Sequence, residues 1–196
     1  MAEPRTTRKT FGAHVRENIV SVVAIFVSVI SLGVAVSSNR TQERLLAASA
    51  WPALEFGTGN RSDSGTDEIT FVLGNNGVGP ARLRGVRVFY RGDFAADSRR
   101  LMQRCCAAGD SPIIAVTSGT RGRVLKAGDR IVLMTLPTDN NSGELWQRLD
   151  RARSDVTVQV CYCSVLDDCW IFDSTRMDPE PVRSCPAVAA EEEWNG

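Results

Sequence analysis

The distribution of apolar residues divides the chain into two parts. Residues 19–36, IVSVVAIFVSVISLGVAV, carry no charge and are mostly β-branched or aliphatic. With the flanking residues 18 and 37–39, this segment is long enough as a helix to cross the ~30 Å hydrocarbon layer of a membrane. A buried core helix would show a polar stripe with charges, and a cleaved signal peptide has a shorter apolar core of ~7–15 residues. We therefore predict an uncleaved signal anchor, a transmembrane helix over residues 18–39.

The basic residues around this segment indicate its orientation. Four precede it and two follow it: Arg5, Arg8, Lys9, Arg16, then Arg40 and Arg44. Because Lys and Arg are retained on the cytoplasmic side, we predict a cytoplasmic tail over residues 1–17 and an extracytoplasmic location for everything after residue 39. Arginine is used almost to the exclusion of lysine, which we interpret as the bias of a GC-rich bacterial genome. The expected location is the bacterial inner membrane, crossed once.

From Ala53 the pattern changes to short alternating runs separated by Gly, Asn, Asp and Pro. In residues 69–90 the apolar positions alternate as in strands, and GNNGVGP forms a turn. The phase of alternation reverses at Gly85, which predicts a β-bulge. Residues 122–136 predict two strands around a turn at Ala127-Gly128-Asp129. Residues 155–163, DVTVQVCYC, predict a strand with Val156, Val158, Val160 and Tyr162 on its buried face, and CWIFDS is expected to pair with it as a hairpin.

Two helical segments are expected outside the membrane. Residues 40–52 form a linker helix that Pro52 ends. Residues 141–153 form a short helix, with Ser142 as N-cap and Leu145, Leu149 and Ala152 on one face. The predicted fold is mainly β: an immunoglobulin-like antiparallel β-sandwich over residues 53–174 with one short helix. Residues 175–196 are polar and contain prolines, and we predict a C-terminal tail.

Several short motifs resemble a bacterial group of uncharacterised single-span membrane proteins. These motifs are Trp51-Pro52, the turn Asn75-Asn76-Gly77-Val78-Gly79-Pro80-Ala81, GRVLKAGD and CYCSVLDDCW. In that group a membrane helix is followed by a β-sandwich domain with Asn-x-Gly-x-Gly-Pro-Ala, which here matches Asn75, Gly77, Gly79 and Pro80. The resemblance covers most of residues 18–173. It implies a membrane-tethered β-sandwich and brings no reaction and no catalytic residues.

Composition excludes several functional classes. The only histidine, His14, precedes the apolar segment, so Ser-His-Asp and Cys-His catalysis and histidine-rich metal sites are excluded from the β part of the chain. The formal net charge is zero, so no overall field attracts nucleic acid. The arginine-rich residues 82–104 are interpreted as a solvated face, with a polyanion site as the alternative. Asp167, Asp168 and Asp173 are interpreted as acidic turn residues, with a cation site as the alternative.

Six cysteines are the remaining candidates for chemistry: Cys105, Cys106, Cys161, Cys163, Cys169 and Cys185. We expect disulfides, because the predicted compartment is oxidising. Cys161 and Cys163 project from one face of a strand, and Cys105 and Cys106 lie in a polar loop. The expected link joins at least one of the first pair to the second pair. A four-thiolate metal site and a thiol-redox centre are the alternatives, although the spacing matches no common zinc finger and no C-x-x-C pair occurs.

Small residues recur along the apolar helix at spacings of three and four: Ser21, Ala24, Ser28, Ser31, Ala35 and Ser38. Such a stripe allows close approach of a second helix in lipid, so we expect packing against a second copy or another membrane protein. The alternative is that small residues are simply tolerated, with each hydroxyl bonded to its own backbone.

The expected function is non-enzymatic and needs no cofactor. We predict a tethered binding or assembly module of the bacterial envelope that contacts membrane lipid and a helix partner but no nucleic acid. One alternative is a cytoplasm-facing membrane-anchored sensor or effector with a cysteine metal site. The other is a thiol oxidoreductase that uses Cys161, Cys163 or the Cys105-Cys106 pair.

Overall fold

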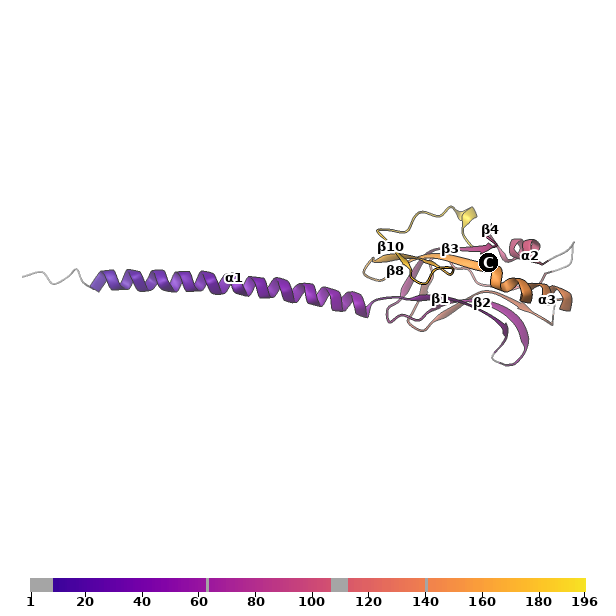
Figure 1. The fold of residues 1–196 in the computed structure, drawn as a ribbon, viewed down its shortest axis with the longest axis horizontal. Coiled ribbons are helices and arrows are strands. Elements are labelled where there is room, and N and C mark those ends of the chain that lie inside the picture. The colour runs from indigo at the N-terminus through magenta and orange to yellow at the C-terminus, as the bar shows by residue number, and fades with distance from the viewer. Residues whose placement is uncertain (1–8, 63, 107–112, 140) are drawn as a thin grey trace, which may run out of the picture. The chain divides into compact units, whose positions relative to one another are not determined.

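The computed structural model describes residues 9–62, 64–106, 113–139 and 141–196. The chain divides into two compact units, Met1–Ala48 and Ser49–Gly196. The first unit contains almost all of helix α1 (Lys9–Ser49), and the second contains all the strands (Figure 1). We call Ser49–Gly196 the β domain.

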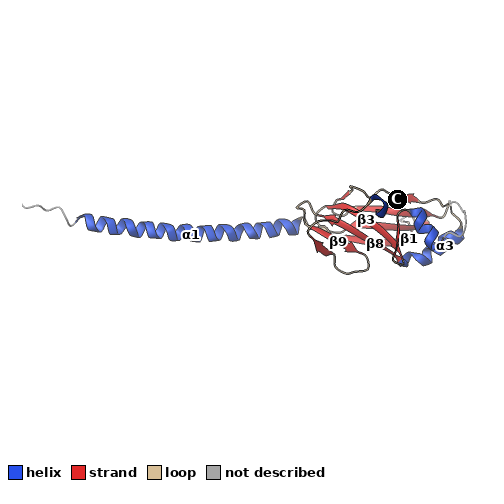
Figure 2. Cartoon of the chain, turned by 90° about the horizontal axis from the view of Figure 1, so that it is seen from above, coloured by secondary structure: helices blue, strands red, loops and turns tan. Residues whose placement is uncertain are grey.

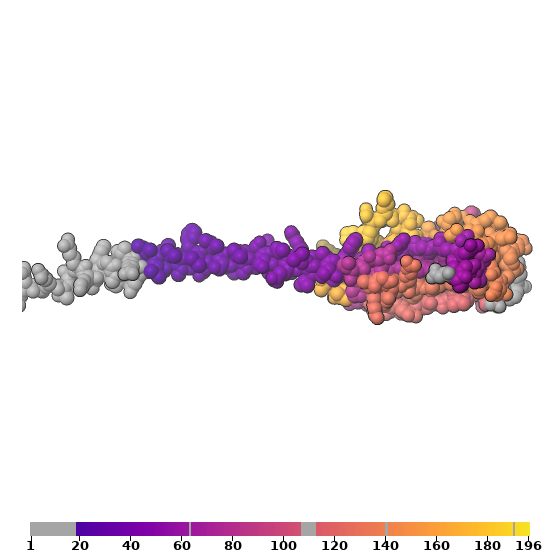
Figure 3. All heavy atoms as spheres, turned by 90° about the horizontal axis from the view of Figure 1, so that it is seen from below, coloured from indigo at the N-terminus to yellow at the C-terminus, as the bar shows by residue number. Residues whose placement is uncertain are grey.

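Helix α1 is long and apolar enough from Ile19 onward to cross a membrane. None of its most apolar stretch is buried within the chain, and its side chains are exposed along the length that Figure 3 draws in colour. Phe26, for example, is 68% exposed. Side chains this apolar favour an apolar surrounding over water, so α1 is a candidate membrane span. The helix continues without a break through most of the predicted linker and ends at Ser49, shortly before Pro52.

The strands form two antiparallel sheets (Figure 2). The first sheet contains, in spatial order, β1 (Leu54–Arg61), β2 (Asp67–Asn75), β7 (Arg130–Pro137) and β5 (Val116–Thr117). The second contains β10 (Glu180–Val182), β9 (Cys169–Asp173), β8 (Val156–Cys163), β3 (Ala81–Tyr90) and β4 (Asp93–Ala95), with β6 (Val124–Leu125) beside β3. The β domain also contains helices α2 (Ser98–Cys105) and α3 (Gly143–Ala152) and the 3₁₀ helices η1 (Arg153–Asp155) and η2 (Ala190–Glu192).

The two sheets share one hydrophobic core. Phe71 and Leu73 from the first sheet belong to the same cluster of buried side chains as Val86 and Val158 from the second. Over most of β2 and the first half of β8, buried positions alternate with half-buried ones, which is the pattern of a sheet with one face on a core. Burial in this core also raises the pKa of Tyr162 to about 12, because the charged phenolate would lose its hydration there.

The local predictions in this region are largely confirmed. The bulge is present at Gly85: Leu83 lies opposite Tyr162 and Gly85 opposite Cys161, so β3 carries one extra residue. The hairpin of β8 and β9 is also present. The predicted cap of α3 is formed, since the Leu145 N–H donates to Ser142 Oγ at 3.2 Å, and the predicted apolar face of α3 is buried.

The two predicted turns connect strands of different sheets. Residues 76–80 lead from β2 to β3, and residues 126–129 lead from β6 to β7. Both turns are therefore corners between the sheets and not hairpin turns.

The polar loop predicted around Cys105 and Cys106 is wrong, because this segment forms helix α2. Asp97 caps the helix, with its carboxylate accepting from the Arg100 N–H at 2.7 Å. Leu101 and Met102 are buried. The segment has only two apolar residues among several arginines, so its helical periodicity is too weak to predict a helix from the sequence.

The predicted C-terminal tail is also wrong. Strand β10 pairs with β9, and Trp194 is only 1% exposed. We call residues 183–195 the strap. The Trp194 N–H donates to the Val86 carbonyl at 2.7 Å, and the Asn195 N–H donates to the Ala96 carbonyl at 2.9 Å. The strap crosses β3 at the bulge, where a Cβ on Gly85 would come within 2.9 Å of Val188.

Candidate functional site

The residues of the Asn-x-Gly-x-Gly-Pro turn meet the chain where it enters the β domain. Asn75 is the last residue of β2 and is fully buried. Its side-chain nitrogen lies 2.8 Å from the Gly79 carbonyl, 3.0 Å from that of Leu125 and 3.2 Å from that of Lys126. Its side-chain oxygen accepts from the N–H groups of Ala53 and Gly77, both at 3.1 Å. One amide therefore satisfies backbone groups of the entry segment, the turn and the corner after β6.

The two glycines of the turn are required by close packing. The Trp51 carbonyl accepts from the N–H groups of Val78 at 3.0 Å and Gly79 at 3.1 Å. A Cβ at Gly77 would overlap the main chain of Trp51 and Ala53, and a Cβ at Gly79 would overlap that of Ala50. Neither glycine has a positive φ. The turn motif is therefore a structural device, and Pro80 leads from it directly into β3.

All six cysteines lie at disulfide distance from a partner. The pairs are Cys105–Cys106, Cys161–Cys185 and Cys163–Cys169. The predicted link between the β8 cysteines and the Cys105-Cys106 pair is wrong. Cys161 and Cys163 lie opposite the first half of β3, whereas α2 follows β4, which pairs with the last residues of β3. The two groups of cysteines thus lie toward opposite ends of this strand.

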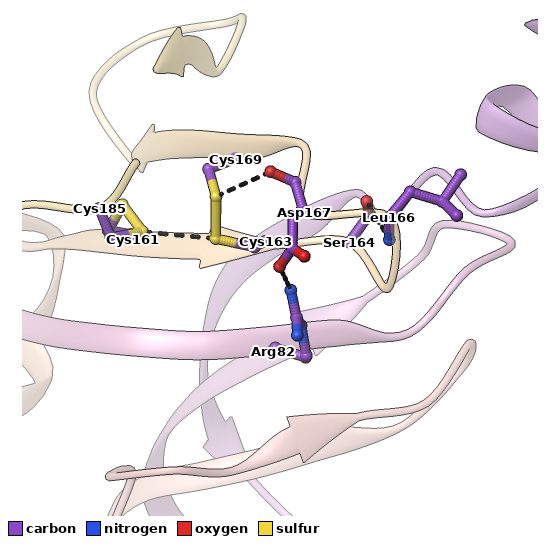
Figure 4. Close-up of a disulfide and its surroundings, with 8 residues drawn as sticks. All are labelled: Arg82, Cys161, Cys163, Ser164, Leu166, Asp167, Cys169 and Cys185. Atoms are coloured by element: carbon purple, nitrogen blue, oxygen red, sulfur yellow. Dashed lines mark hydrogen bonds and ion pairs between the residues drawn. A yellow bond between two sulfur atoms is a disulfide. The ribbon is translucent and has the colours of Figure 1, made fainter. Parts of the chain in front are cut away.

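Four of these cysteines form a cluster at one end of the second sheet (Figure 4). Cys163 and Cys169 are directly opposite each other in the β8–β9 hairpin, with Cα atoms 4.0 Å apart. Cys161 reaches Cys185 at the start of the strap, with Cα atoms 5.7 Å apart. The two disulfides are neighbours, since the sulfurs of Cys163 and Cys185 are 3.8 Å apart. We call Cys161, Cys163, Cys169 and Cys185 the four-cysteine cluster.

Arg82 lies beside this cluster. It is directly opposite Cys163 in the pairing of β3 with β8 and forms an ion pair with Asp167 (Figure 4). The hydrogen bond and charge of Arg82 lower the pKa of Asp167. Arg82 Nε is buried and makes no hydrogen bond within the described part of the chain. The Asp167 carbonyl oxygen is 3.4 Å from Cys169 Sγ.

The Cys105–Cys106 disulfide has a different setting. It lies at the C-terminal end of α2, and Arg148 of α3 donates to the Cys106 carbonyl at 3.1 Å. The pair therefore lies where α2 and α3 meet.

Several of the acidic and basic residues singled out in the sequence form contacts within the β domain. The Asp173 carboxylate accepts from the Thr175 N–H at 2.9 Å and from its hydroxyl at 2.6 Å. Arg87 pairs with Glu192, and Arg91 pairs with Asp155. Together with the Arg82–Asp167 pair, these contacts place three arginines of residues 82–104 in separate ion pairs, which favours the solvated-face interpretation over a polyanion site.

The outer face of the first sheet has a shallow hollow. Its volume is 170 Å³, and its lining residues are Glu55, Gly57, Val72, Gly74, Asn76 and Arg130. Small-molecule sites usually enclose ~300–1,000 Å³, so this hollow is too small for a typical organic ligand.

Comparisons with protein-family models, with curated proteins and with solved structures find no match to this chain.

Proposed function

We propose that this chain is a non-enzymatic binding or assembly module of the bacterial envelope. In this proposal α1 anchors it in the inner membrane, residues 1–17 are cytoplasmic, and the β domain is an extracytoplasmic immunoglobulin-like β-sandwich. The observation that carries the proposal is that one chain combines an apolar helix of membrane length with six cysteines that all lie at disulfide distance from a partner. Structural disulfides form and persist in oxidising compartments, and for a membrane-anchored bacterial protein that is the outside.

The geometry of the β domain supports a binding role over catalysis. Among the described residues, the buried polar side chain with the most hydrogen bonds is that of Asn75, and these bonds go to backbone groups of the fold. The hollow on the first sheet is too small for most substrates. The hydrogen bonds of Asn75 thus stabilise the fold itself, and we propose that a partner binds at the edges or outer faces of the sheets.

The side of the membrane is testable with an exposed cysteine probe. Met177 is fully exposed in a turn, so Met177→Cys adds a free thiol without affecting the core. We expect a membrane-impermeant maleimide to label Met177→Cys in intact cells. The matched control, Thr7→Cys in the N-terminal segment, should label only after the cells are permeabilised. Labelling in the reverse order would place the β domain in the cytoplasm and contradict the proposal.

The partner in the membrane is proposed to pack on the small-residue stripe of α1. Small side chains allow helix backbones to approach closely in lipid, where apolar residues gain little from meeting each other. Within the helix, Ser28 Oγ already donates to the Ala24 carbonyl at 2.7 Å. The contact would therefore depend on close packing more than on serine hydrogen bonds across it.

A pair of matched triple variants tests this stripe. Replacement of Ala24, Ser28 and Ser31 by Leu should abolish association measured by a membrane two-hybrid assay, because bulky side chains separate the helices. Replacement of Val23, Val27 and Ile30 by Leu changes the neighbouring face and should preserve association. Equal signals from the two variants would remove the stripe as an interface.

A further inference from the structure

The four-cysteine cluster brings together sulfurs from three separate segments of the chain. Cys161 and Cys163 come from β8, Cys169 from β9, and Cys185 from the strap. The first three are buried and Cys185 is partly exposed. Four thiolates at one point are the ligand set that a structural zinc ion takes. The spacing in the sequence does not indicate this ligand set, because Cys185 comes close to the other three cysteines only when the strap packs on the sheet.

The separation of the sulfurs fits a zinc ion. In a tetrahedral site with Zn–S bonds of about 2.3 Å, neighbouring sulfurs are ~3.8 Å apart. The sulfurs of Cys163 and Cys185, which are not bonded to each other, are already 3.8 Å apart. Those of Cys163, Cys169 and Cys185 all lie within 4.8 Å of one another. Cys161 is bonded to Cys185, so its sulfur lies beside this group of three and becomes available as the fourth ligand when the disulfides are reduced.

The charge around the cluster also fits a metal thiolate. A zinc ion with four thiolates carries a net charge of about −2. Arg82 lies directly opposite Cys163, and its buried Nε has no hydrogen-bond partner in the described structure. The Arg82 guanidinium therefore lies beside the cluster, where it would stabilise the negative charge.

We propose that Cys161, Cys163, Cys169 and Cys185 bind one zinc ion when they are reduced, and that oxidation to two disulfides releases it. A thiol or phosphine reductant supplies two electrons to each disulfide, and two protons from the thiol or from water complete the two thiols. Zinc then displaces the thiol protons to solvent as the thiolates coordinate it. In the reverse direction a disulfide oxidant accepts two electrons from each pair of cysteines and is itself reduced to two thiols. The four cysteines thus cross-link the same segments in two alternative ways, through two disulfides when oxidised and through one zinc ion when reduced. This proposal concerns the chemistry of the cluster and does not depend on the side of the membrane.

The test uses the full chain in detergent micelles, reduced with a phosphine and titrated with Co²⁺ as a spectroscopic probe and then with Zn²⁺. We expect about one metal ion per chain and the thiolate-to-cobalt charge-transfer and intense visible bands of a tetrahedral sulfur site. Cys169→Ser and Cys185→Ser should each weaken binding by more than the ~10–100-fold cost of losing an outer-shell partner. The double variant Cys105→Ser/Cys106→Ser is the matched control and should bind like the natural chain.

Three results would overturn the proposal. The first is the absence of a tetrahedral cobalt spectrum in the reduced chain. The second is equal affinity in Cys185→Ser, and the third is equal metal uptake by the oxidised chain. If reduction unfolds the β domain, circular dichroism must show that zinc restores its β spectrum, and failure to do so also counts against the site. The labelling of Met177→Cys in intact cells is unaffected by any of these outcomes, so the two proposals fail separately.

Discussion

Replacement of Asn75 by Ala should lower the free energy of unfolding of the β domain by about 4 kcal/mol. The substitution removes the hydrogen-bond partner of up to five backbone groups. These include the carbonyls of Gly79 and Leu125 and the N–H of Ala53. Each buried polar group left without a partner costs about 1–3 kcal/mol. Relaxation of the surrounding structure, or a water molecule that enters the vacated space, offsets part of the total for the five groups. Chemical denaturation followed by tryptophan fluorescence measures the change.

The adjacent Asn76 provides the control for this prediction. Its side chain is exposed and bonds to the Glu55 carboxylate on the outer face of the first sheet. Asn76→Ala should change the free energy of unfolding by less than about 0.5 kcal/mol, as is usual for surface positions. If the two alanine variants are equally stable, the role of Asn75 as the centre of this corner is wrong.

Replacement of Trp194 by Ala should cost about 3–5 kcal/mol, the usual penalty for removing a large aromatic side chain from a core. Trp194 is 1% exposed and belongs to the same buried cluster as Phe71 and Val88. Its indole Nε1 is buried without a hydrogen-bond partner among the described residues. Trp194→Phe, which keeps most of the apolar contact and removes this unpaired N–H, should therefore recover much of the loss.

Trp51 is the matched control for Trp194, because the substitution is the same and the side chain is 48% exposed. Its bonds to the turn use only its main-chain carbonyl, which alanine retains. Trp51→Ala should therefore destabilise the β domain by less than half as much, as judged by the same denaturation experiment. If Trp194→Ala is as stable as Trp51→Ala, the strap does not stabilise the β domain and the original prediction of a C-terminal tail would be correct.

Local patterns in the sequence predict the elements that carry their own periodicity. Strand β8 alternates four apolar side chains with less apolar ones, and each of the four is buried. The reversal at Gly85 gives the bulge, because one extra residue shifts every later side chain to the other face. Helix α3 combines a capping serine with an apolar face, and either signal alone would be weaker.

Contacts between distant segments could not be predicted in the same way. Trp194 is a single aromatic residue in a polar segment, so no period marks it as part of the core. The Cys161–Cys185 pair joins residues 24 positions apart, and its choice over Cys105 depends on where α2 and the strap lie on the sheet. The four cysteines proposed to bind zinc also come together only when the strap packs on the second sheet, so their spacing in the sequence does not identify them as a site. Spacing gives the number of possible pairings, whereas the topology of the sheets selects one of them.

The position of Cys185 in the strap has a consequence for biogenesis. During vectorial synthesis Cys161, Cys163 and Cys169 all emerge before Cys185 does. For that interval three thiols share a single hairpin, so an oxidant that arrives early can join Cys161 to Cys169 and leave Cys163 for Cys185. Cells that lack a disulfide isomerase should then accumulate a mispaired species with the same mass but a different mobility in non-reducing electrophoresis. If the β domain folds in the oxidising compartment proposed above, we expect the order in which the chain is made to influence how much of it reaches the native pairing.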